Sequence, residues 1–205
     1  MDELYIFVRR VMRGIPMAQM TKLALAQSLK QLMAERTLDK ITVKEIVNRC
    51  GVNRQTFYYH FKDIYDLLDW MFINEGQEFS RKYPDSRTND DGEAAIRNMC
   101  TYLKDNRQIV INIYHSLGRE LLDRYLCREM AKLLHGTLSY RAQAFGATEE
   151  DLDYLIAFYK HAFVGSLLDW VHGGLSGNID DIVQKMVPIL QGTFDAALKR
   201  MAASR

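Results

Sequence analysis

The chain has 205 residues, of which 48% are hydrophobic and 26% are charged, a composition typical of a globular protein with a sizeable core. Three prolines and twelve glycines are few for this length, which disfavours a loop-rich β fold and favours long helices. Three cysteines without a Cys-x-x-Cys pair indicate neither a disulfide framework nor a structural zinc site. Because no apolar run is long enough to span a membrane and the N-terminus lacks a signal-peptide pattern, we expect a cytoplasmic protein with no membrane partner.

The formal net charge of +1 is unevenly distributed along the chain. Residues 17–62 carry eight lysines and arginines against three acidic residues, whereas residues 63–205 carry sixteen against twenty-one. A basic N-terminal segment on an acidic body is the pattern expected of a polyanion-binding head. The charge therefore points to nucleic acid as a partner, although a chance excess of basic residues on a solvated surface would look the same.

The first sixteen residues allow two interpretations. Apolar residues recur there at helical spacing with arginines between them, and Gly14 and Pro16 end the pattern. Residues 1–16 either form an extra basic amphipathic helix or are a non-native leader, with Met17 the true start.

Two short helices with sharp boundaries are predicted in the basic segment. Thr42 and Glu45 have the spacing of a capping box at a helix start, and Gly51 is a natural left-handed residue for its end. Asn53 is a typical N-cap for the helix that follows at residues 54–60. A short helix, a glycine-containing turn and a second short helix together predict a helix-turn-helix.

Longer helices are predicted on both sides of this motif, because apolar residues recur there at helical spacing. Turn-forming residues separate them, most densely at 83–92, which marks a domain junction or a long surface loop. Pro188 should kink the last helix. The expected ranges are 21–36, 63–82, 95–106, 108–145 with a possible break at Gly118, 149–171 and 180–201.

In a helix-turn-helix the first helix braces the second, which presents polar residues near its N-terminus to the major groove of DNA. Arg54 and Gln55 occupy that position. Arginine can bond guanine O6 and N7, and glutamine can bond adenine N6 and N7. For Phe57 and Phe61 we expect core packing.

The segment GVNRQTFYYHFKDIYDLL resembles the signature of TetR-type (tetracycline-repressor-like) transcription regulators. In that family a Gly-Val turn precedes a recognition helix with a threonine, an aromatic residue and Tyr-x-His-Phe. The resemblance is tight over about residues 20–70. It implies an all-α protein, with an N-terminal three-helix helix-turn-helix DNA-binding domain followed by a helical ligand-binding and dimerisation domain. We expect the extension at 1–16, the DNA-binding domain at 17–64 and the effector-binding and dimerisation domain at 65–205.

Carried over position by position, the resemblance implies that Arg54, Gln55 and Tyr59 face base edges. It implies phosphate contacts by Thr42, Thr56, Tyr58 and His60, with packing as the alternative role of Tyr58 and Tyr59. The family commonly has a lysine where this chain has Ile64, and Lys62 could replace it. A small residue is common at the position of Gln55, so a base preference cannot be borrowed. The predicted DNA-binding surface comprises Thr42, Lys44, Asn53, Arg54, Gln55, Thr56, Tyr58, Tyr59, His60 and Lys62.

The last two predicted helices are apolar on more than one side. Such a helix is buried on two sides, so one side can serve the monomer core and the other a partner chain. The resemblance implies that these helices pair with their mates as a four-helix homodimer interface, which also suits two heads that read a two-fold symmetric DNA site. The residues expected in the interface are Phe163, Leu167, Ile182, Met186, Leu190, Phe194 and Leu198.

Polar and aromatic residues also recur at inward positions of the body, where the family often holds an effector. These are Tyr114, His115, Arg119, Tyr159, His161, Trp170 and His172. We expect the pocket wall to comprise Tyr114, His115, Tyr159, His161 and Trp170, although ordinary core or surface side chains are the simpler interpretation of each. No pair has metal-ligand spacing and no Ser-His-Asp or Cys-His set is visible, so we predict no metal, no cofactor and no enzyme activity.

These observations predict a dimeric regulator that binds double-stranded DNA at a two-fold symmetric operator, a repressor released by a small-molecule effector. The alternative is an activator whose body binds a protein co-regulator, because FYYHFKDIYDLLDW is similar to a branch of the family that includes regulators of dihydroxyacetone kinase genes. One closed apolar cavity in the body would favour the first, and a filled body with an exposed apolar patch would favour the second.

Overall fold

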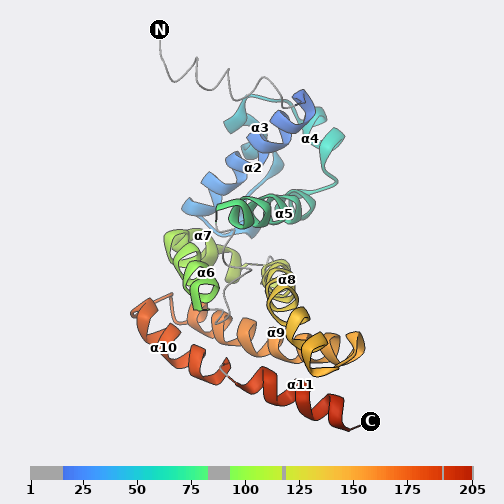
Figure 1. The fold of residues 1–205 in the computed structure, drawn as a ribbon. Helices are drawn as coiled ribbons and strands as arrows, with labels where there is room; N and C mark the ends of the chain where they lie inside the picture. The colour runs from blue at the N-terminus through green and yellow to red at the C-terminus, as the bar shows by residue number, and fades with distance from the viewer. Residues whose placement is uncertain (1–15, 83–92, 117–118, 191, 205) are drawn as a thin grey trace, which may run out of the picture.

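The computed structural model describes residues 16–82, 93–116, 119–190 and 192–204 (Figure 1). All regular secondary structure within these ranges is helical, so the predicted all-α class is confirmed. The expectations for residues 1–15 and for the loop at 83–92 lie outside the described residues. Within the same ranges, no helix combines the length and the apolar character that a membrane crossing requires.

Three α-helices and one short 3-10 turn form the N-terminal part, hereafter the head. They are α2 (Met17–Glu35), η2 (Leu38–Lys40), α3 (Val43–Cys50) and α4 (Arg54–His60). The side chains of Leu29, Ile46 and Phe57 are fully buried at its centre. The buried Ser28 hydroxyl donates a 2.8 Å hydrogen bond to the carbonyl of Ile46, which ties α2 to α3.

The helix α5 (Ile64–Lys82) leaves the head and runs into the rest of the chain (Figure 1). It buries an apolar stripe that includes Leu67, Leu68 and Phe72. The Phe72 ring stacks on Tyr125 with a centroid distance of 4.7 Å. The helix therefore packs against both parts of the chain.

Within the described residues, six further helices form the body. They are α6 (Glu93–Asp105), α7 (Arg107–Tyr114), α8 (Arg119–Phe145), α9 (Glu149–His172), α10 (Ile179–Leu190) and α11 (Thr193–Ala203). The long helices α8 and α9 pack against each other, and α11 lies against both (Figure 1). The buried apolar residues of head and body join in one continuous core.

The C-terminal segment differs from the single kinked helix predicted at 180–201. The structure has two helices there, because α10 ends at Leu190 and α11 begins after Gly192. Pro188 removes one hydrogen-bond donor near the end of α10. Gly192 then has φ +80°, in the left-handed region, which a continuing helix cannot contain.

Candidate nucleic-acid interface

The two helices of the predicted motif begin with side-chain caps. The Thr42 hydroxyl accepts from the amide of Glu45 at 3.3 Å, and the Glu45 carboxylate accepts from the amide of Thr42 at 2.9 Å. At the start of α4, the Asn53 side-chain oxygen accepts from the amide of Thr56 at 2.8 Å. The predicted capping box and the predicted N-cap are both confirmed.

Gly51 forms the turn between α3 and α4. Its φ of 73° and ψ of 23° place it in the left-handed region. The amide of Val52 donates to the carbonyl of Val47 at 3.1 Å, which closes the end of α3. The prediction that α3 ends at a left-handed glycine is confirmed.

Two aromatic residues anchor α4 to the head. Phe57 is fully buried and Phe61 nearly so, with ring centroids 6.0 Å apart, which confirms the core packing predicted for both. Phe61 also meets Trp70 of α5 edge-on at 5.9 Å. The ammonium of Lys22 lies 5.5 Å from the Phe61 ring, so a cation covers this contact. These anchors hold α4 at a fixed angle to α2 and α5.

The outer side of α4 presents polar and aromatic groups. Tyr58 is 59% exposed and Tyr59 is 83% exposed, so the packing alternative does not hold for either within this chain. Arg54 and Gln55 are exposed as well. Of the ten residues in the predicted DNA-binding surface, only Thr56 and His60 are half-buried, and the other eight are exposed.

Apart from Lys22 and Lys30, which contact Trp70 and Glu75 of α5, the basic residues of positions 17–62 fall into two groups. Arg36 lies 2.8 Å from the carboxylate of Glu45, and Arg49 lies 2.7 Å from that of Glu35. The hydrogen bond from Arg49 lowers the pKa of Glu35, while the hydrogen bonds from Thr42, helped by Arg36, lower the pKa of Glu45. These pairs fasten α3 to α2.

The second group has no acidic partner in the described part of the chain, and its members are all exposed. It lies on η2, on the first turn of α3, at the start of α4 and just after α4. Positive charge that is not neutralised within the head therefore collects around the helix-turn-helix. The group consists of Lys40, Lys44, Arg54 and Lys62.

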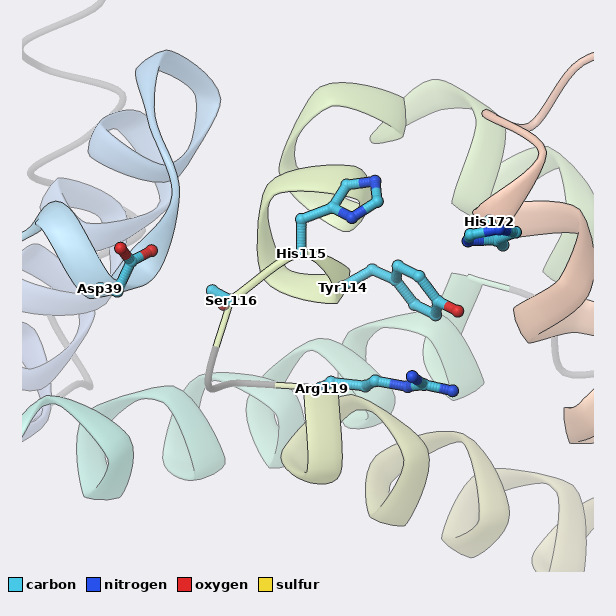
Figure 2. Close-up of a pocket in the computed structure, with 6 residues that line it drawn as sticks. All are labelled: Asp39, Tyr114, His115, Ser116, Arg119 and His172. Atoms are coloured by element: carbon cyan, nitrogen blue, oxygen red, sulfur yellow. The ribbon is translucent and has the colours of Figure 1, made fainter.

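The residues predicted to form an effector pocket do not converge. Tyr114 and His115 line one hollow of about 630 Å³ (Figure 2). Tyr159 instead packs on Phe194 at 4.5 Å, His161 Nδ1 lies 3.7 Å from the thiol of Cys127, and Trp170 Nε1 donates to the carbonyl of Ser176 at 2.7 Å. Of the five residues expected in one pocket wall, this hollow thus contains Tyr114 and His115. Residues 159 and 170 are separated by roughly 16 Å along one helix, at 1.5 Å per residue.

The same hollow contains four residues outside the expected wall, one of which is Ser116 at the end of α7. Arg119 and His172 belonged to the inward set, whereas no sequence signal pointed to Asp39. Arg119 begins α8, His172 ends α9 and Asp39 lies in η2. Helical spacing cannot show which helix ends meet in space, and that is why this grouping was missed.

Most of the predicted dimer residues are buried within the single chain. Phe163, Leu167, Phe194 and Leu198 are each at most 6% exposed, so placing them in an interface with a partner chain is wrong. They lie in the core of this protomer. Ile182 and Met186 are half-buried, and the side chain of Leu190 lies outside the description.

Other apolar residues on these helices face outward. Tyr154 and Phe158 on α9 are 71% and 66% exposed, and Ile189 on α10 is 64% exposed. A helix that is apolar nearly all round does not reveal in its sequence which stripe faces its own core.

Comparisons with known proteins agree with this architecture. A family model for the bacterial regulatory proteins of the tetR family matches residues 27–71, and a model for a transcriptional regulator C-terminal region matches residues 90–192. The HTH-type dhaKLM operon transcriptional activator DhaS of Lactococcus lactis subsp. lactis (strain IL1403) is 34% identical over 58 residues, which is 28% of this chain and 31% of that protein. The match thus spans about a third of that relative's length.

A solved structure, the dihydroxyacetone kinase operon activator DhaS, has the same fold. It superimposes with a TM-score of 0.64 over 86% of this chain and 97% of that chain, at 17% identity. Together, the two family models cover the helix-turn-helix and most of the helical body. The chain therefore belongs to the TetR family of transcription regulators and is not an enzyme.

Proposed function

We propose that this protein is a homodimer that reads a two-fold symmetric operator in double-stranded DNA, with α4 in the major groove. The observation that carries the proposal is the outer side of α4. Arg54, Gln55 and Tyr59 are exposed there, while Phe57 on the opposite side fixes the helix in the head. Exposed polar residues on a rigid, well-anchored helix are what base readout requires.

The residues around α4 are suited to phosphate contacts. Lys44 and Lys62 are exposed and have no acidic partner among the described residues. The amide of Lys62 donates to the carboxylate of Asp66 at 2.8 Å, which fixes the backbone between α4 and α5. A lysine on a fixed backbone at this position can take the role of the lysine that the family commonly has at Ile64. The proposed DNA-binding domain extends over 17–64 and the regulatory and dimerisation domain over 65–205.

The proposed dimer forms through an outward side of α9 together with α10. Positions 154, 158, 161, 162 and 165 repeat at intervals of three and four, so they share one side of α9, and all are exposed. Tyr154 and Phe158 supply apolar area, and Gly165 allows a partner helix to approach closely. Such a pairing would bring two heads to successive major grooves, about 34–36 Å apart.

The direction of regulation has two candidates. If a small molecule releases the protein from its operator and expression then rises, the protein is a repressor. Activation is favoured by the likeness to DhaS, which is an operon activator. A reporter fused to the regulated promoter decides between them, because deleting the regulator raises expression under a repressor and lowers it under an activator.

The DNA-binding proposal is tested with Arg54→Ala. Operator fragments are first selected from random DNA with the full-length protein, and binding is then measured by gel shift. A bidentate base contact is worth about 1–3 kcal/mol, so Arg54→Ala should bind the operator at least fivefold more weakly. Arg124→Ala, an exposed arginine on α8, is the matched control and should bind like the parent. Equal binding by both variants would show that α4 does not read the operator.

A further inference from the structure

A hollow of about 630 Å³ lies at the joint between the head and the body. Its lining residues come from η2 in the head and from the end of α7, the start of α8 and the end of α9 in the body. Figure 2 shows Tyr114 and Arg119 extending side by side toward His172, with Asp39 on the far side of Ser116. The lining thus combines an arginine, two histidines and a phenol with a single carboxylate.

The arginine of this hollow is held in place but is not neutralised. The Arg119 guanidinium lies 4.8 Å from the centre of the Tyr114 ring, a cation–π contact that fixes its plane. The Tyr114 ring is also 5.3 Å from His115 and 5.8 Å from His172. Among the residues that the structure describes, no carboxylate pairs with Arg119.

We propose that this hollow binds a small carboxylate or phosphate anion, with Arg119 as its principal ligand. A planar guanidinium with free N–H groups matches the paired oxygens of either anion. The imidazoles of His115 and His172 and the hydroxyl of Tyr114 supply further donors around the same space. That the bound anion acts as the effector of the regulator rests on the function proposed above.

The position of the hollow connects its occupancy to the head. Asp39 belongs to the head and lines the same hollow as Arg119 of the body, so the attraction between their opposite charges favours a closed joint, with head and body placed as in this structure. An anion beside Arg119 neutralises the guanidinium and repels the carboxylate of Asp39, which favours an open joint with head and body further apart. The helix α7, which carries Tyr114, also holds α2, because Asn112 donates to the carbonyl of Met33 at 2.7 Å. The anion binds the open joint better, and this difference in affinity is what shifts the head.

Anion binding is measured on the full-length protein without DNA. Inorganic phosphate, acetate and succinate are titrated against chloride at matched ionic strength, and binding is followed by the NMR signals of the histidine imidazoles. Arg119→Gln should weaken the saturable binding by roughly tenfold or more, because a charge-assisted bidentate contact is lost. Arg124→Gln on the same helix is the matched control and should leave it unchanged. Whichever probe saturates at the lowest concentration identifies the anion as a phosphate or a carboxylate.

Two results would overturn the site: no saturable binding of any of the three probes, or binding by Arg119→Gln within twofold of the parent. If phosphate instead binds at the basic surface of the head, its binding should persist in Arg119→Gln and be lost in Arg54→Ala. These two variants therefore distinguish the two phosphate sites.

A second titration measures operator affinity with and without the best probe. The probe should change it at least fivefold in the parent and less in Asp39→Asn. If the probe binds but operator affinity is unchanged, the effector role is refuted and the anion site is retained. If the protein binds no operator at all, only the function proposed above is refuted.

Discussion

Replacing Gly51 by alanine tests whether the turn of the helix-turn-helix requires a left-handed residue. At φ 73° this glycine has no neighbouring atom within 4 Å of the position that a Cβ would take. An alanine there meets no steric contact from the rest of the protein, and its cost comes from its own backbone alone. A left-handed conformation costs a non-glycine residue about 1–2 kcal/mol. The free energy of unfolding should fall by that amount.

Gly146, between α8 and α9, is a matched control for this substitution. Its φ is 72° and it too has open space around the Cβ position, so Gly146→Ala should lose a similar free energy of unfolding. Only Gly51 lies directly before α4, and a change of its backbone would turn α4 relative to α3. Gly51→Ala should therefore also bind the operator several-fold more weakly, whereas Gly146→Ala should bind like the parent.

The assay is thermal unfolding at one fixed chain concentration, followed by operator titration well below the unfolding temperature. For a chain of this size, each 1 kcal/mol corresponds to about 2–4 °C. Gly51→Asn should recover at least half of the loss, because asparagine tolerates the left-handed region better than alanine does. If Gly51→Ala unfolds at the parent's temperature, or if asparagine is no better than alanine, the backbone explanation is refuted.

Three more outcomes follow from the charges and the exposed apolar groups. Lys62→Ala should weaken binding to all DNA sequences and reduce the slope of log affinity against log salt by about one per half-site, which gel shifts at several salt concentrations measure. Phe158→Asp should give monomers in light scattering with the helix content unchanged, and a dimer of parental strength would contradict the interface on α9. The pKa of Glu45 is lowered in the folded protein, so its contribution is present above the unfolded pKa and is lost as the pH falls through the folded pKa. Glu45→Gln should consequently unfold at a lower temperature than the parent at pH 7, and the difference should diminish as the pH falls through the folded pKa.

The parts of the structure that could be predicted from the sequence depend on neighbours within a few residues. The Thr42–Glu45 capping box, the Asn53 cap and the Gly51 turn are all of this kind, and each is found in the structure. The signature of the family is local in the same way, because one recognition helix and its anchors lie within twenty residues.

The parts that could not be predicted depend on how distant helices meet. On α9 the stripe with Phe163 and Leu167 and the stripe with Phe158 are both apolar, and only packing against α8 and α11 decides which becomes core. Asp39 and Arg119 line one hollow although eighty positions separate them in the chain. The periodicity of apolar residues shows which residues share one side of a helix. It does not show which other helix packs against that side.

The ties within the head suggest how regulation can reach DNA. The Ser28–Ile46 hydrogen bond and the Arg49–Glu35 ion pair join α3 to α2, so we expect the head to move as one unit. One of its links to the body is the carboxylate of Glu75 on α5, which pairs with Lys30 of α2 at 2.7 Å and accepts a hydrogen bond from the hydroxyl of Tyr102 on α6 at 2.5 Å. Burial, reinforced by Glu75, raises the pKa of Tyr102, so this hydroxyl stays a donor. In the proposed dimer, an effector at the joint would thus tilt whole heads and change the distance between the two α4 helices, while the base contacts within each head stay the same.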